Sequence, residues 1–170
     1  MEEPKKKRNR RTRAELEAGV FDAVRQLASE KGLAQITFTD IMQRAGIQMS
    51  VLLKNYKSID RVLDKYAYFS DYWLHDLFDE EHPTDKAGED ILKRNLKSLA
   101  VYLYDNIDMQ HLLVWELEAD NPTTRRIARS REKHYRTAID ELKHLFEGTG
   151  IPADIIAGLL TAGTYYLILH

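Results

Sequence analysis

The chain has 170 residues, 44% of them hydrophobic and 31% charged, which predicts a soluble protein of one compact domain, or one plus a small accessory unit, and argues against a wholly disordered chain. The absence of cysteine excludes disulfides, thiolate nucleophiles and cysteine-based zinc sites. The net charge of −2 conceals an asymmetry, because residues 1–66 carry 14 Lys/Arg and 9 Asp/Glu, whereas residues 67–170 carry 11 and 18.

The first predicted segment is a flexible basic arm at residues 1–13. Seven Lys and Arg side chains lie between positions 5 and 13, among them Arg10, Arg11 and Arg13. No apolar run follows the arm, so we expect no secretory signal and a cytoplasmic protein. A basic segment ahead of an acidic remainder is typical of a chain that contacts nucleic acid. A solvated tail that aids solubility explains the charge equally well.

Two helices are predicted after the arm. Apolar residues recur at spacings of three and four from Ala14 onward, which indicates a helix that ends at Gly32. Thr37 and Asp40 have the spacing of a capping box, in which each side chain bonds the other residue's backbone N–H. They predict the start of a second helix, which ends at Gly46.

The remaining chain also follows a helical pattern. A short helix is predicted at 49–55, and Ser58 is expected to cap a long helix that ends in the acidic loop 79–83. This long helix should bury the apolar side chains Val62, Leu63, Tyr66, Phe69, Trp73 and Leu77. Further helices are expected at 88–105, 108–119, 122–147 and 153–170. The sequence therefore predicts an all-α protein.

The two short helices predict a helix-turn-helix around residues 45–47. Gly46 supplies the backbone freedom that a sharp turn between helices needs. In such a unit the second helix enters the major groove of DNA and presents side chains to the base edges. The candidate DNA contacts on or beside the two short helices are Thr37, Thr39, Gln48, Met49, Ser50, Val51, Lys54, Asn55 and Lys57. The basic arm adds Arg10, Arg11 and Arg13 for phosphates.

The spacing of these elements resembles the TetR family of bacterial transcriptional regulators, from about Ala14 to Leu63. The resemblance covers the stretch "FDAVRQLASEKGLAQITFTDIMQRAGI" and continues to "LLKNYKSIDRVL". Residues that match the family pattern in place are Thr37, Ile41, Ala45, Gly46, Ile47, Tyr56, Ser58, Val62 and Leu63. The resemblance implies a DNA-binding domain at 14–58 and an effector-binding and dimerisation domain at 59–170.

The same resemblance implies how the protein acts. A homodimer would bind a palindromic operator on double-stranded DNA, as a repressor that a small apolar or aromatic effector releases. Its two recognition helices would lie about 34–36 Å apart, one turn of the duplex. An effector that binds only a splayed dimer would shift the population away from that spacing.

Some positions depart from the family pattern. Gln48 is a poor cap for the recognition helix, and Ser50 stands where glycine is usual. Leu53 and Ile59 occupy places where the family commonly has a tyrosine and a lysine that contact phosphate. An alternative is therefore a small-molecule-binding or protein-interaction module whose DNA reader has decayed.

The second half is rich in aromatic residues, for which ordinary core packing is the simpler interpretation. An effector pocket between helices is the functional one. Its candidate contacts are Tyr66, Phe69, Trp73, Tyr102, His111 and Trp115. The acidic loop 79–83 is expected to be solvated, and we expect no metal, no cofactor and no catalytic site, because no motif for them is present.

The final predicted helix is apolar, with fifteen consecutive uncharged residues from Ile155 to Leu169. A bilayer needs roughly twenty such residues, so we expect a buried helix at a dimer interface rather than a membrane segment. The candidate interface residues are Gly158, Ala162, Tyr165 and Tyr166. Because the chain stops inside this apolar run, we expect that it continues beyond His170 or that the helix is completed in the dimer.

Overall fold

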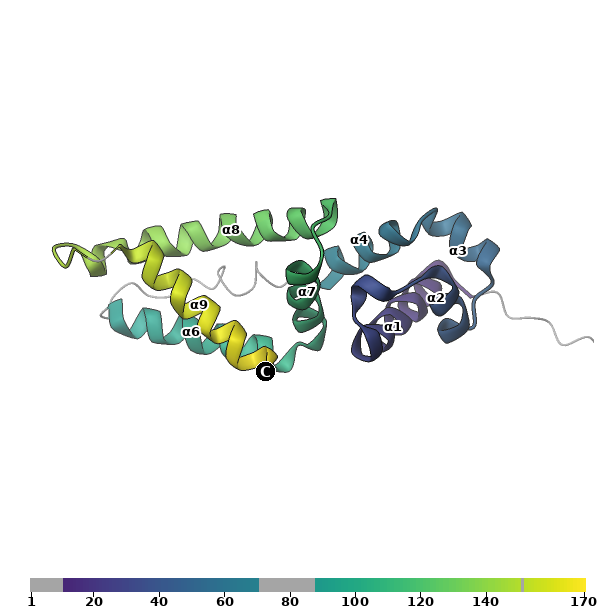
Figure 1. Ribbon diagram of the computed structural model, residues 1–170, viewed down its shortest axis with the longest axis horizontal. Coiled ribbons are helices and arrows are strands. Elements are labelled where there is room, and N and C mark those ends of the chain that lie inside the picture. The colour runs from purple at the N-terminus through teal and green to yellow at the C-terminus, as the bar shows by residue number, and fades with distance from the viewer. Residues whose placement is uncertain (1–10, 71–87, 151) are drawn as a thin grey trace, which may run out of the picture.

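The computed structural model describes residues 11–70, 88–150 and 152–170, and this part of the chain is all-α, as the sequence predicts (Figure 1). It contains eight α-helices, two 3₁₀ turns and no strand. In chain order the elements are α1 (Arg13–Lys31), η1 (Leu33–Gln35), α2 (Phe38–Ala45), α3 (Met49–Tyr56), α4 (Ile59–Ser70), α6 (Gly88–Asp105), α7 (Ile107–Glu118), α8 (Pro122–Leu142), η2 (Lys143–Phe146) and α9 (Ala153–Leu169). Four features named from the sequence lie outside the described residues: Arg10, Trp73, Leu77 and the loop 79–83.

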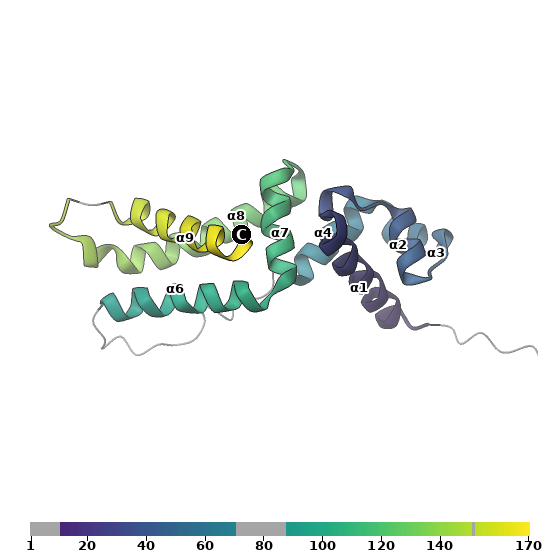
Figure 2. The same cartoon turned by 60° about the horizontal axis from the view of Figure 1, so that its bottom comes forward.

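The helices are arranged in two parts. We call α1, η1, α2 and α3 the N-terminal unit, and α6, α7, α8 and α9 the second bundle. Figure 1 shows the N-terminal unit at one end of an elongated molecule and α6, α8 and α9 at the other. Helix α7 lies between them, and α4 leads from α3 back to α7. Figure 2 shows α6 running beside α8 and α9. Among the described helices, none is long and apolar enough to cross a bilayer.

The core is continuous between the two parts. Its buried side chains come from α1, α2, α3 and α4 and from α6, α7 and α8. The largest that are almost fully enclosed are Tyr66, Leu33, Ile41, Leu52, Leu103, Met109, Leu112 and Ile127. Apolar burial therefore stabilises the N-terminal unit together with its contact on α7.

Helix α1 begins one residue earlier than the pattern of apolar residues indicates, because Thr12 caps it. The Thr12 Oγ1 accepts a hydrogen bond from the N–H of Glu15 at 3.2 Å. The Glu15 carboxylate accepts one from the N–H of Thr12 at 2.7 Å, which completes a capping box. The Thr-x-x-Glu spacing is visible in the sequence, but an apolar pattern begins only at Ala14, so the predicted arm extends one residue into the helix.

Two further expectations are corrected. Phe69 was expected to be buried, but it is 67% exposed. The buried stripe of α4 consists of Val62, Leu63 and Tyr66, as predicted, together with Ala67, and the Phe69 ring lies 5.5 Å from the Phe21 ring of α1. The helix expected at 122–147 ends at Leu142, where the chain tightens into the 3₁₀ turn η2. Ser58 does begin α4 as predicted, and its Oγ accepts the N–H of Arg61 at 3.4 Å.

Candidate nucleic-acid interface

Helices α2 and α3 are joined by a tight turn at Gly46. This residue has φ +60° and ψ 40°, the left-handed conformation, and its N–H donates to the carbonyl of Met42. A β-carbon at Gly46 would meet open space, so the requirement for glycine comes from the backbone angle and not from crowding. Ile47 is buried under the turn. As a result, α3 begins only four residues after α2 ends.

The start of α2 is held by the capping box that the sequence predicts. The Asp40 Oδ2 accepts hydrogen bonds from the Thr37 N–H at 2.7 Å and the Thr37 hydroxyl at 2.6 Å. Lys31 of α1 donates to the same oxygen at 2.6 Å. The hydrogen bond from Lys31, followed by those from Thr37, lowers the pKa of Asp40 to about 2. The Thr37 hydroxyl is thus engaged in the fold, whereas Thr39 is exposed.

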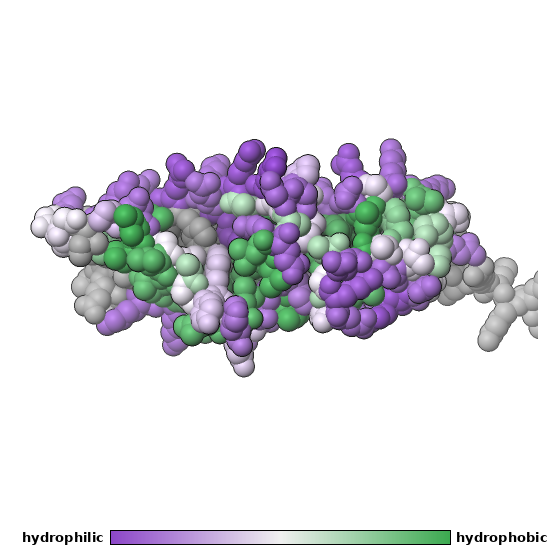
Figure 3. All heavy atoms as spheres, viewed as in Figure 1, coloured by the Kyte–Doolittle hydropathy of each residue, from purple (hydrophilic) through white to green (hydrophobic). Residues whose placement is uncertain are grey.

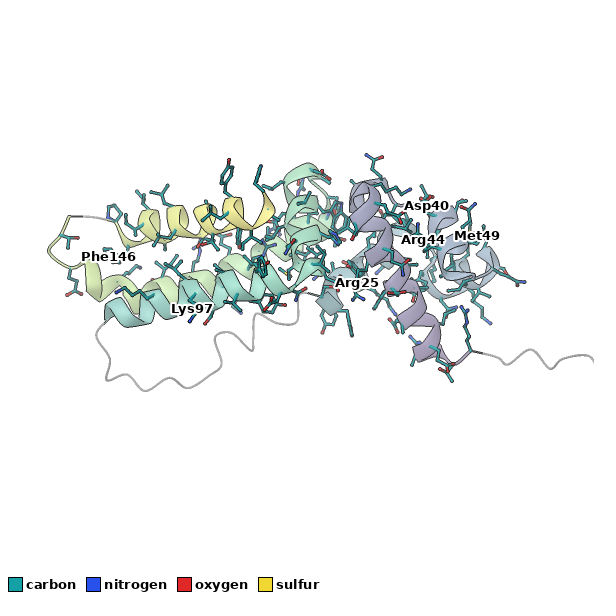
Figure 4. The ribbon with its side chains drawn as sticks, turned by 90° about the horizontal axis from the view of Figure 1, so that it is seen from below. Arg25, Asp40, Arg44, Met49, Lys97 and Phe146 are labelled. Atoms are coloured by element: carbon teal, nitrogen blue, oxygen red, sulfur yellow. The ribbon has the colours of Figure 1, made fainter. Side chains whose placement is uncertain are left out.

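The end of α2 is tied to α1 by a second ion pair. The Arg44 guanidinium donates through two nitrogens to the Glu30 carboxylate at 2.8 and 2.6 Å, and also to the Gln26 side chain at 3.2 Å. Figure 4 shows Asp40 and Arg44 close to α1. Both pairs are partly exposed to water, so each contributes only modest stability, but together they tie α2 to α1 at both of its ends.

Helix α3 presents a polar surface. Leu52 and Tyr56 are its buried anchors, and Met49 and Val51 are half-buried. The exposed side chains on this helix and its flanks are Gln48, Ser50, Leu53, Lys54, Asn55 and Lys57. Figure 4 places Met49, the first residue of α3, at the opposite end of the molecule from Phe146. The helix contains no acidic residue, so its exposed charge is positive.

Gln48 and Asn55 differ in whether their side chains form hydrogen bonds within α3. Gln48 precedes the helix with extended backbone and makes no side-chain cap bond, as its poor capping chemistry leads one to expect. The Asn55 side-chain amide donates to the carbonyl of Val51 at 2.7 Å, which leaves its oxygen for other partners. Lys57 has an unusual positive φ of 65° at the end of the helix.

Arg11, the basic residue just before α1 in the described part of the chain, lies near the α2–α3 turn. Arg11 Nη1 donates to the carbonyl of Ala45, the last residue of α2, at 3.2 Å. Arg13 is exposed in the first turn of α1. The contact from Arg11 to Ala45 spans 34 residues, and no pattern in the sequence signals it.

The candidate effector residues do not share one environment. Tyr66 and Trp115 are core side chains, 1% and 5% exposed, and Phe69 is exposed. Tyr102 is half-buried, and its hydroxyl oxygen accepts a hydrogen bond from the Asn106 amide. His111 lies 3.2 Å from the Ser29 hydroxyl of α1. Within the described ranges, no group of three His, Asp or Glu side chains could hold a metal ion.

Helix α9 has one exposed apolar face. The exposed fractions of Ile155, Leu159, Tyr166 and Leu167 are 56%, 65%, 63% and 78%. The small residues between them, Gly158, Ala162 and Gly163, are also exposed. Tyr165 is half-buried on the side of α9 that packs against the core. Figure 3 shows hydrophobic surface gathered over α9.

Comparison with known proteins identifies no relative, since no protein-family model and no curated protein matches the chain. The functional proposal therefore rests on the geometry of the α2–α3 pair and of the α9 face.

Proposed function

We propose that the protein is a homodimeric, DNA-binding transcriptional regulator similar to the TetR family. Its N-terminal unit would be a helix-turn-helix domain, and its second bundle would bind an effector and dimerise. The observation that carries the proposal is the α2–Gly46–α3 arrangement, in which a left-handed glycine joins two eight-residue helices. The second helix then exposes a polar, basic surface at one end of the molecule.

Helix α3 would lie in the major groove. Gln48, Ser50 and Asn55 carry the amide and hydroxyl groups that read base edges, and Met49 and Val51 can touch a thymine methyl group. Lys54 and Lys57 follow on the same helix end, where ammonium groups would contact phosphates. Because Arg11 lies against Ala45, the start of α1 brings further positive charge to the turn.

The exposed face of α9 would form the dimer interface. Its members follow two rows with a four-residue spacing, one through Ile155, Leu159, Gly163 and Leu167 and one through Gly158, Ala162 and Tyr166. Such rows interdigitate with the same rows of a second helix, and small residues allow close approach. A symmetric dimer covers this face with its own copy and presents two α3 helices to a palindromic operator.

The effector would be a small apolar or aromatic molecule that binds in the second bundle. Its binding would release the protein from DNA, so the protein would act as a repressor, in the cytoplasm. The alternative is a protein-interaction or small-molecule-binding module. Leu53 favours this alternative. It is 46% exposed on α3, and a leucine cannot donate a hydrogen bond to a DNA phosphate.

Binding to DNA at several salt concentrations tests the proposal. The probe is a pool of randomised duplexes of roughly 30 base pairs, long enough for two half-sites one turn apart. The variant Lys54→Gln/Lys57→Gln removes two charges beside α3. The control, Lys97→Gln/Lys143→Gln, removes two charges from exposed positions in the second bundle.

We expect the α3 variant to bind more weakly and to flatten the slope of log K against log salt by about 2, since each phosphate contact contributes about −0.9. The control should keep the slope of the unchanged protein. If the unchanged protein selects no sequence from the pool, or if both variants behave alike, α3 is not a DNA reader and the interaction-module alternative gains.

A further inference from the structure

A polar junction joins the N-terminal unit to α7. The Arg25 guanidinium of α1 donates to both oxygens of Asp108, from Nε at 2.7 Å and from Nη2 at 2.6 Å. The Tyr66 hydroxyl of α4 donates to the same carboxylate at 2.8 Å. One side chain from α7 therefore holds one from α1 and one from α4. Figure 4 shows Arg25 on the part of α1 that faces away from α3.

The Asp108 carboxylate is enclosed but remains charged. Its side chain is 14% exposed and that of Arg25 is 42% exposed. Burial by itself would raise the pKa of Asp108, but the hydrogen bonds from Arg25 and Tyr66 outweigh burial, so the pKa lies below its ordinary value. Asp108 also lies in the first turn of α7, where the helix dipole favours a negative charge. Burial, followed by the bond to Asp108, raises the pKa of Tyr66, which keeps its hydroxyl a donor.

A second contact lies one helical turn away. The Ser29 hydroxyl of α1 and Nε2 of His111 on α7 are 3.2 Å apart. Arg25 and Ser29 are four residues apart on α1, and Asp108 and His111 are three apart on α7, so each helix supplies both side chains from one face. Hydrogen bonds at two successive turns fix both the register and the rotation of α7 on α1, because they are directional. Apolar contacts are not directional and fix the register less strictly.

Other arginine–carboxylate pairs with two hydrogen bonds have a different place in the fold. Arg44 and Glu30 join α2 to α1 inside the N-terminal unit. Arg125 and Asp120 join the start of α8 to the residues just before it, inside the second bundle. These pairs have the same chemistry as Arg25–Asp108 but do not connect the two parts of the molecule. They therefore supply matched controls.

We propose that Asp108 is a positioning residue that fixes the orientation of the N-terminal unit on α7. A state of α7 that withdraws the carboxylate loses its bonds to α1 and α4 together. The N-terminal unit then keeps its apolar contact with α7 but loses the charged contact that fixes its orientation. The consequence for DNA, that this orientation sets the spacing of two α3 helices in a dimer, rests on the proposed function. The positioning role itself does not.

The orientation is measured between two spin labels. The chain has no cysteine, so labels can be placed on Gln43→Cys of α2 and Arg129→Cys of α8, both exposed positions. Labelled chains are mixed with excess unlabelled chains so that an assembly carries one labelled copy. Asp108→Asn should broaden or shift the distance distribution between the labels. Asp120→Asn, the control, should leave it unchanged.

A milder variant guards against loss of folding. Tyr66→Phe removes the hydroxyl that bonds Asp108 and keeps the ring that packs edge-on against Phe21. It should broaden the distribution less than Asp108→Asn and leave the helix content unchanged by circular dichroism. Unchanged distributions in both folded variants would overturn the positioning role, as would equal broadening by Asp120→Asn.

Binding separates the two proposals. With a duplex selected from the randomised pool, Asp108→Asn should weaken specific binding about tenfold, which corresponds to one charge-assisted hydrogen bond, and should leave binding to mixed-sequence duplexes unchanged. If the labels move but the unchanged protein binds no duplex, the proposed function fails and the positioning role stands. If the unchanged protein binds its duplex and neither the labels nor the affinity respond to Asp108→Asn, the positioning role fails.

Discussion

His111 of α7 faces the Ser29 hydroxyl of α1. It is half-buried on α7, and its Nδ1 is enclosed without a hydrogen-bond partner. Burial lowers the pKa of His111, and the nearby Arg25 charge acts in the same direction, while Asp108 opposes both. The folded protein therefore favours the neutral form of His111 more than the unfolded chain, which charges it below a pH of about 6.5.

This difference predicts how stability depends on pH. The stability that neutral His111 contributes is fully present above its unfolded pKa and is lost as pH falls toward its lower folded pKa. The free energy of unfolding should thus decrease more between pH values of about 7.5 and 5.5 for the unchanged protein than for His111→Gln. Urea unfolding at fixed protein concentration measures it. Parallel pH profiles for the two proteins would contradict this interpretation.

At the scale of an element, α2 has a solvent-exposed N-terminus that side-chain hydrogen bonds cap. Asp40 receives three donors, two from Thr37 and one from Lys31. The Thr37 hydroxyl oxygen in turn accepts the backbone N–H of Asp40 at 3.3 Å, which satisfies one of the first N–H groups of the helix. Thr39, two residues after Thr37, is exposed in the same first turn. Substituting each threonine in turn therefore distinguishes the stability lost with the cap from a loss of DNA contact.

Thr37→Ala should destabilise the protein by about 1 kcal/mol, the usual cost of removing an N-cap side chain. Thr39→Ala should change stability by less than about 0.5 kcal/mol, as is typical of exposed positions. If Thr39 contacts a phosphate, its variant should instead weaken DNA binding. Thermal unfolding and duplex titration of both variants measure these effects. Equal stability losses would show that the Thr37 cap is not what holds the start of α2.

At the scale of the whole molecule, the two surfaces that the proposed function requires lie in different parts of the structure. The exposed α3 surface belongs to the N-terminal unit and the apolar α9 face to the second bundle, with α7 between them (Figure 1). The packing of α7 and α4 on α1 connects the second bundle to the N-terminal unit. Asp108 contributes three hydrogen bonds to that packing, and the Ser29–His111 contact adds a further polar one.

The dimer proposal predicts that a charge on α9 separates the copies. Ala162→Glu would place a carboxylate beside its two-fold copy inside an apolar interface, where burial of side chains otherwise gains roughly 25 cal/mol per Å². Leu117→Glu, which adds a charge to an 82% exposed leucine of α7, is the control.

Analytical ultracentrifugation should find Ala162→Glu as a monomer or an aggregate that has lost operator binding, and Leu117→Glu unchanged from the parent protein. A stable dimer of Ala162→Glu would place the interface elsewhere, with the helix α8 as the next candidate.

The features that the sequence determined are local ones. The all-α class follows from apolar spacing, and the Thr37–Asp40 box lies within three residues, where one turn of helix brings both side chains together. Gly46 was predictable as a turn because left-handed backbone is accessible to glycine at low cost. That Gly158 and Ala162 share a face of α9 likewise follows from their spacing within a single helix.

Only the tertiary structure decided which distant groups meet. Arg25 and Asp108 are 83 residues apart, and each looks in the sequence like an ordinary charge on a helix surface. Phe69 fits the apolar pattern of α4 but is 67% exposed, whereas Ala67 is buried. A residue's spacing sets the side of its own helix on which it lies, but its partner depends on how whole helices pack.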